Sequence, residues 1–233
     1  MFDRRVEGDE LTFGVSGKLI MNNLVMWDRQ TKSLWLQFTG EGIEGANKGQ
    51  ALARVAHTQT TWEAWRDAHP ETLVLDKRGG YGGDAYGGYY DDGRKGVLGE
   101  SHGDDRLPPK DLVVGYIAGS NAKGYPFRTL VETPVINDEF EGDKILVLFD
   151  DRSQTGQIFR REVDGRTLTF SLLERTRSDI VLRDFETGTT WSGITGEALS
   201  GPLSGERLDA RPSFYAFWFA WSDFFLEAEL YEG

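Results

Sequence analysis

The chain has 233 residues, with 39% hydrophobic and 12% aromatic residues, a composition typical of a folded protein with a sizeable core. Its formal net charge of −12 leaves no basic surplus to displace counterions, so we expect no nucleic-acid partner. The absence of cysteine excludes disulfides, thiolate metal sites and a cysteine nucleophile.

Glycine usage and apolar patterning narrow the fold class further. Twenty-nine glycines against seven prolines indicate many tight turns, which favours a strand-rich fold. No apolar run approaches membrane-spanning length, and the first residues form no apolar signal region, so we expect no membrane span in this chain. These features leave the compartment, the cofactor and the oligomeric state open.

The first 76 residues are predicted to be mostly β-structure with one short helix. Residues 2–13 alternate apolar and polar side chains around an acidic glycine turn, which predicts a hairpin. Further short strands are expected at residues 24–27, 34–38 and 73–75. Residues 60–68 are predicted to be helical, because Thr60 or Thr61 can cap them and a proline follows.

The rest of the chain begins with a segment rich in glycine and tyrosine, residues 77–110, which we expect to be a loop. Strands are predicted at residues 112–118, 135–137, 145–149 and 229–231. Residues 213–225 are predicted to form a second helix, capped by Ser213 and much more aromatic than the first. Aromatic residues at helical spacing usually face a core. We therefore expect core positions for Trp62, Trp65, Trp218, Phe219 and Trp221.

An internal repeat organises the whole sequence. Residues 2–13 recur as residues 159–170, and residues 35–52 recur as residues 191–208 with tryptophan, Thr-Gly-Glu, two glycines and a final leucine at matching positions. A repeat of this length indicates duplicated half-domains rather than a solenoid.

We therefore expect an α+β, mostly antiparallel β-protein of two tandem homologous half-domains, each with a short aromatic-rich helix. The first repeat spans residues 1–76, the inter-repeat loop residues 77–110 and the second repeat residues 111–233. The second repeat has strand-forming sequence ahead of its Phe159 block, whereas the first starts directly at Phe2. The first repeat is thus expected to be N-terminally incomplete, with residues 2–6 at an exposed or partner-covered sheet edge.

Several motifs together match a known family. They include Trp-Leu-Gln-Phe-Thr-Gly-Glu at residues 35–41, Tyr-Gly-Gly-Tyr-Tyr at 86–90, Asp-Asp-Arg-Leu-Pro-Pro-Lys at 104–110 and Phe-Trp-Phe-Ala-Trp at 217–221. With these segments the chain resembles the bacterial and archaeal family called domain of unknown function 3179. The resemblance implies no established activity. Members commonly carry a Tyr-Cys-Pro motif ahead of the Phe-Asp-Arg block, and many look exported; this chain starts at that block and has no cysteine.

Carboxylates supply the candidates for catalysis. Glu41 and Glu197 end the repeated Thr-Gly-Glu motif, and paired carboxylates perform general acid–base chemistry in glycoside hydrolysis. A hydrolase would use Glu41 with Asp104 or Asp105. Alternatively, the repeated threonine and glycine form a turn in which the glutamate only supports the backbone.

The densest polar cluster in the sequence follows the glycine–tyrosine segment and consists of His102, Asp104, Asp105 and Arg106. A histidine with two aspartates has the donor types of a divalent metal site, so His102, Asp104 and Asp105 are the metal candidates. The same residues could equally cap and anchor the end of a long loop.

Aromatic and amide side chains supply the ligand-binding candidates. Tyrosines set among glycines combine amphipathic rings with an adaptable backbone, but the same tyrosines could equally pin a linker to the core. Gln37 lies beside Trp35 in the first repeat, where the second repeat has Gly193; either one copy keeps a binding role, or the residue has drifted on an exposed strand. The predicted ligand-binding set is Trp35, Gln37, Tyr86, Tyr89, Tyr90 and Arg106.

Two hypotheses about function follow from these candidates. The first is a ligand-binding or structural module with a cleft between the two repeats, suited to a small molecule, glycan or peptide. The alternative is a hydrolase acting on glycans or peptides through paired carboxylates, or a metal-dependent site in the inter-repeat loop. An enzyme requires carboxylates that converge on one cleft, whereas a binding module requires only an accessible aromatic surface.

Overall fold

Antiparallel sheets build the protein, whose computed structural model describes residues 1–76, 87–90, 92–177 and 179–233. Within these residues every strand pair is antiparallel except the parallel pair of β19 (Glu229–Leu230) with β8 (Asn121–Pro126). The prediction of a mostly antiparallel α+β fold is therefore confirmed.

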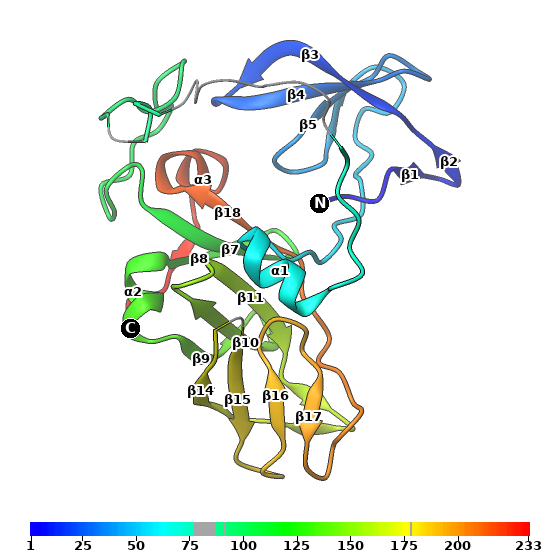
Figure 1. Cartoon of the computed structure of the whole chain (residues 1–233). Helices are drawn as coiled ribbons and strands as arrows, with labels where there is room; N and C mark the ends of the chain where they lie inside the picture. Colours follow the sequence, from blue (N-terminus) through cyan, green and yellow to red (C-terminus); the bar gives the residue numbers. More distant parts are fainter. Residues whose placement is uncertain (77–86, 91, 178) are drawn as a thin grey trace.

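The first sheet lies at one end of the molecule (Figure 1). Its strands pair in chain order and are β3 (Phe13–Ile20), β4 (Asn23–Asp28), β5 (Leu34–Leu36) and β6 (Gly42–Glu44). A small hairpin of β1 (Arg5–Val6) and β2 (Asp9–Glu10) precedes it. Glu7 and Gly8 join the two strands with φ values of 51° and 94°, as a tight hairpin turn requires. Within the described residues β1 pairs with β2 alone, so it is an edge strand.

The middle of the molecule contains two further sheets (Figure 1). One has the order β18-β7-β8-β19, with β7 at Leu112–Ala118 and β18 at Ser213–Phe217. The other has the order β11-β10-β9, with β9 at Val135–Phe140, β10 at Asp143–Asp150 and β11 at Thr155–Arg160. The six residues Ile145–Asp150 of β10 are all buried, because neighbouring structure covers both faces of this strand.

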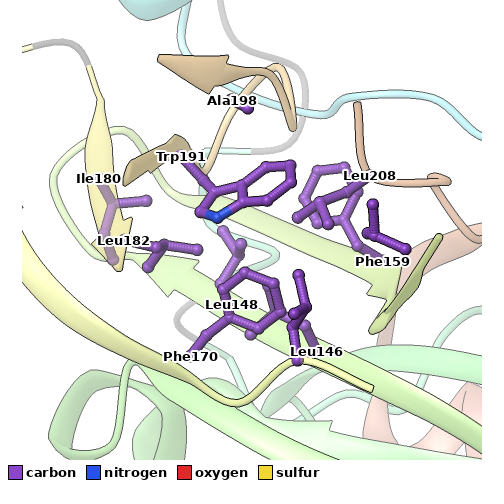
Figure 2. Close-up of a cluster of buried hydrophobic side chains, with 11 residues drawn as sticks. Leu146, Leu148, Phe159, Phe170, Ile180, Leu182, Trp191, Ala198 and Leu208 are labelled. Atoms are coloured by element: carbon purple, nitrogen blue, oxygen red, sulfur yellow. The ribbon is translucent and has the colours of Figure 1, made fainter. Parts of the chain in front are cut away.

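The last sheet lies at the opposite end of the molecule from the first (Figure 1). Its strands also pair in chain order and are β14 (Phe170–Arg175), β15 (Ile180–Asp184), β16 (Thr190–Ser192) and β17 (Ala198–Ser200). The hairpin of β12 (Glu162–Val163) and β13 (Arg166–Thr167) precedes it. Leu146 and Leu148 of β10 pack on this sheet around Trp191 and form a closed core with Phe170 and Leu182 (Figure 2).

The same buried hydrogen-bond network occurs in both end sheets. The indole N–H of Trp35 donates to Asp28 over 2.9 Å, and that of Trp191 donates to Asp184 over 2.9 Å. Each tryptophan is fully buried, and its N–H finds its acceptor on the neighbouring strand. Trp35 and Trp191 are therefore core residues held in place by a carboxylate.

Three helices are described, and two of them correct the sequence predictions. α1 (Trp62–Ala68) is capped by the side chain of Thr61, as expected. The predicted helix at residues 213–225 is wrong at its start, because Ser213–Phe217 pair with β7 and only α3 (Trp218–Phe224) is helical. The short helix α2 (Phe127–Glu132) was not predicted. Residues 73–75 form no strand, in contrast to the prediction.

Within the described residues, no helix has the length and apolar character needed to cross a membrane.

The tryptophans of α1 and of α3 differ sharply in burial. Trp218 and Trp221 of α3 are fully buried, and the ring of Trp221 lies against Gly115 of β7. Trp62 of α1 is 50% exposed, and Trp65 is only partly buried. The expectation that Trp62 belongs to a core is thus wrong, since the described structure places no sheet over α1 comparable to the one that covers α3.

A pH-dependent contact ties the two middle sheets together. The hydroxyl of Tyr116 on β7 donates to Asp143 on β10 over 2.6 Å, and Arg211 donates to the same carboxylate over 3.2 Å. The bond from Tyr116 and the charge of Arg211 outweigh partial burial and hold the pKa of Asp143 below its ordinary value.

Because the folded pKa is lowered, the ionised Asp143 contributes stability above its unfolded pKa of about 3.9, and this contribution is lost as the pH falls through the folded value. We expect Asp143→Asn to be less stable than the wild type at pH 6 and to show a smaller loss of stability between pH 5 and pH 3. Urea denaturation at several pH values measures this. An unchanged pH slope in Asp143→Asn would contradict the assignment.

Candidate functional site

A large cavity lies between the first sheet and β18. Its volume is about 1280 Å³, larger than the 300–1,000 Å³ usual for small-molecule sites. Its walls are mainly apolar and come from distant parts of the chain: Phe2, Phe13, Met26, Phe38, Leu52, Phe214, Tyr215 and Phe217. The cavity exists because these walls face each other across a space that no described side chain fills.

The charges around the cavity are opposite in sign to the net charge of the chain. The described lining includes Arg4, Arg54 and Arg94 but no aspartate or glutamate, although the chain carries a net charge of −12. Arg4 forms an ion pair with Glu10, and Arg94 forms one with Asp92. Two of the three arginines that line the cavity are thus already paired with a carboxylate outside the lining.

Arg54 is the most constrained of these arginines. It makes no ion pair within the described residues, and its Nη2 donates to the carbonyl oxygen of Thr39 over 3.3 Å. Its Nε is buried without a hydrogen-bond partner in the described structure, and burial lowers the pKa of the guanidinium. Nearby, burial and then the N-terminal ammonium lower the pKa of His57, so that its imidazole is neutral at pH 7. Arg54 is therefore a partly buried cation beside the cavity.

The structure brings three of the predicted ligand-binding residues to this cavity. Gln37, Tyr89 and Tyr90 line it. The rings of Tyr89 and Tyr90 lie 6.3 Å and 6.2 Å from that of Phe217, and Lys110 donates to the carbonyl oxygen of Tyr89. These contacts attach the end of the glycine–tyrosine segment to β18. Tyr86 lies outside the described residues.

The other two ligand-binding candidates lie elsewhere. Trp35 has no exposed surface and belongs to the core of the first sheet. Arg106 chelates Asp104 with its guanidinium, donates to the carbonyl oxygen of Ala228 over 3.0 Å and stacks over the ring of Trp218 at 5.0 Å. These contacts anchor residues 104–106 to the C-terminal part of the chain.

The catalytic and metal candidates are not joined by any described contact. Glu41 is exposed and forms a backbone bridge with Ala51. Asp104 accepts from Arg106, and this bond together with the charge of Arg106 keeps the pKa of Asp104 below its ordinary value despite burial. Asp105 is exposed. Within the described residues, no three side chains of His, Asp or Glu form a group that could hold a metal ion.

His102 lies beside a buried carboxylate, Asp223, that no sequence motif indicates. Asp223 of α3 is fully buried and accepts the backbone N–H groups of Ser101 and His102 over 2.8 Å each. The Nδ1 atom of His102 lies 3.4 Å from the same carboxylate. Asp223 therefore fixes the loop ahead of β7.

Sequence reasoning missed most of the cavity wall. Arg54 has no motif around it, and the aromatic residues Phe214 and Phe217 matched the spacing of a helix core. Only the position of β18 at the edge of its sheet brings both residues to the cavity. The presence of aromatic residues in the segment was a signal for burial but not for a cavity.

The fold and the site define a class: a mostly antiparallel β-protein with a large, aromatic-lined cavity that has arginines at its wall. The family model described as "Protein of unknown function (DUF3179)" matches residues 1–228, so the chain belongs to this family. No curated protein and no solved structure matches the chain.

Proposed function

We propose that the protein is a ligand-binding module built from two tandem repeats, residues 1–76 and 111–233, joined by residues 77–110, and that its ligand binds in the cavity. The repeat is supported by the recurring sequence blocks and by the identical strand order of the two end sheets. It is supported further by the matching bonds of Trp35 to Asp28 and of Trp191 to Asp184.

The observation that carries the binding function is the contrast between the cavity and the rest of the protein. An acidic chain has three arginines and no carboxylate in the described lining of this mainly apolar cavity. A ligand with an apolar body and at least one anionic group matches this lining, because aromatic walls hold the body and Arg54 is available to the anion.

The difference between Gln37 and Gly193 agrees with this proposal. A side chain at position 193 would bring its Cβ within 2.7 Å of the carbonyl oxygen of Ile180, so the second repeat has no room for one. The side chain of Gln37 is exposed and lines the cavity. A polar group thus faces the space in the first repeat only.

No observation on the described residues favours the hydrolase or the metal-dependent alternative. Neither Glu41 nor Asp104 nor Asp105 lines the cavity. We therefore propose binding rather than catalysis at this site.

We expect 8-anilinonaphthalene-1-sulfonate, an anionic aromatic probe, to bind at one saturable site, and Phe217→Ala to weaken this binding by about tenfold through loss of aromatic contact. Fluorescence titration measures the affinity. Phe185→Ala is the matched control, because Phe185 is 72% exposed and lies outside the cavity lining, so the affinity should be unchanged. Equal effects of the two substitutions would show that the probe does not report on the cavity.

A further inference from the structure

One wall of the cavity is an open sheet face with a closed counterpart in the same chain. Phe2, Phe13 and Met26 line the cavity and are only partly buried. By the repeat these residues correspond to Phe159, Phe170 and Leu182, whose side chains are 2%, 2% and 0% exposed. The same kind of surface is thus exposed to the cavity in one half and covered in the other.

The cover in the second half is a β-strand. Leu146 and Leu148 of β10 pack on the sheet of β14–β17, between the rings of Trp191 and Phe170 and the side chain of Leu182 (Figure 2). The side chains alternate along β10, so residues 146 and 148 face the same side. An extended segment with aliphatic residues at alternate positions is therefore what this surface accepts.

The opposite wall of the cavity is the edge of a sheet. β18 pairs with β7 on one side and is terminal in its sheet within the described structure. All of its residues from Ser213 to Phe217 line the cavity, although side chains alternate between the two faces of a strand. The cavity thus borders the edge of β18, where backbone N–H and C=O groups can pair with an added strand.

The counterpart of β18 in the first repeat shows which strand belongs at such a position. This counterpart is residues 57–61, and its threonines at positions 58 and 60 contact β11. The N–H of Thr61 donates to the carbonyl oxygen of Ser153 over 3.1 Å, and the hydroxyl of Thr155 donates to that of Thr60 over 2.6 Å. Because residues 57–61 correspond to β18 in the repeat, a strand like β11 fits beside β18.

We propose that the cavity is the docking site of a β-hairpin carried by a partner polypeptide and chemically like residues 143–160 of this chain. Its first strand places aliphatic residues on the wall of Phe2, Phe13 and Met26, and its second strand adds to the edge of β18. A turn with carboxylates, as Asp150 and Asp151 provide in β10–β11, complements a cavity whose described lining has arginines and no acidic residue. This inference rests on the proposed function and specifies its ligand.

The test uses a fluorescein-labelled synthetic peptide with the sequence of residues 143–160 and the full chain. We expect one peptide to bind per chain in fluorescence anisotropy, and amide hydrogen exchange in Ser213–Phe217 to slow when the peptide is bound. A control peptide with Leu146→Asp and Leu148→Asp should bind at least about tenfold more weakly, because it would bury charge on the apolar wall.

A substitution in the wall tests the same docking from the side of the protein. Met26→Lys should weaken peptide binding at least about tenfold, whereas Leu199→Lys, at a residue of β17 that is 51% exposed and outside the lining, should leave it unchanged. Circular dichroism and thermal melting confirm that both variants are folded. Equal binding to Met26→Lys and to the wild type would overturn the proposal.

The remaining outcomes separate this inference from the proposed function. If the naphthalenesulfonate probe binds but the peptide does not, the hairpin is wrong and the binding cavity stands. If neither binds, both proposals fail. If the protein alone sediments as a dimer with slow exchange in β18, a second copy occupies the cavity and the partner hairpin is wrong.

Discussion

Asp184→Ala is expected to lower the free energy of unfolding by about 2–4 kcal/mol, since a buried donor without an acceptor costs about 1–3 kcal/mol. Asp184 is fully buried and accepts the indole N–H of Trp191 over 2.9 Å. It also accepts the backbone N–H of Thr187 over 2.6 Å and the hydroxyl of the same residue over 2.9 Å. The substitution leaves these groups in a closed core where no acceptor replaces the carboxylate.

Urea denaturation followed by tryptophan fluorescence measures this loss. Asp209→Ala is the matched control, because the Asp209 side chain is 63% exposed and only borders Arg211, so its removal should change stability by less than about 0.5 kcal/mol. The equivalent variant Asp28→Ala should also be clearly destabilised, through Trp35. If Asp184→Ala and Asp209→Ala unfold at the same urea concentration, the buried network contributes no net stability and the interpretation is wrong.

Gly115→Ala is expected to destabilise the protein by about 1–3 kcal/mol through overpacking of a closed core. A Cβ at position 115 would lie closer than 3.0 Å to three ring carbons of Trp221. That ring is fully buried in the cluster that joins β7 to α3, so it has no free space into which it can move.

Gly124→Ala provides the control on the neighbouring strand. Gly124 pairs directly with Gly115, and a Cβ there would lie 3.4 Å from the Nε1 atom of Trp221, an ordinary contact. Thermal melting should therefore show a large decrease for Gly115→Ala and a much smaller one for Gly124→Ala. The double variant Gly115→Ala/Trp221→Leu should lose less stability than the sum of its parts, because the clash is removed. Additive effects would argue against the clash with the ring.

The sequence was most informative where local chemistry decides the structure. Thr61 caps α1, and Glu7 with Gly8 forms the first hairpin turn, because a cap and a tight turn depend on neighbouring residues alone. Gln37, Tyr89 and Tyr90 line the cavity, and their role in binding a ligand stays a prediction.

The predictions from the sequence were wrong where pairing with a distant segment outweighs the local pattern of side chains. Residues 213–217 have aromatic residues at helical spacing, yet they form β18, because β7, about a hundred residues earlier in the chain, offers a complete set of backbone hydrogen bonds. The core position expected for Trp62 failed for a similar reason, because the described structure leaves α1 without the sheet that covers α3.

By itself the amino-acid sequence determined the strand-rich fold class, the lack of disulfides and the acidic character of the chain, whereas Trp35, predicted to bind a ligand, belongs to the core. The tertiary structure alone decided that Phe2, Phe13 and Met26 face the edge of β18 across an open cavity beside Arg54. The physical reason is that turns, caps and hydrophobic patterns are local, whereas a cavity and its charge depend on which distant segments are packed opposite each other.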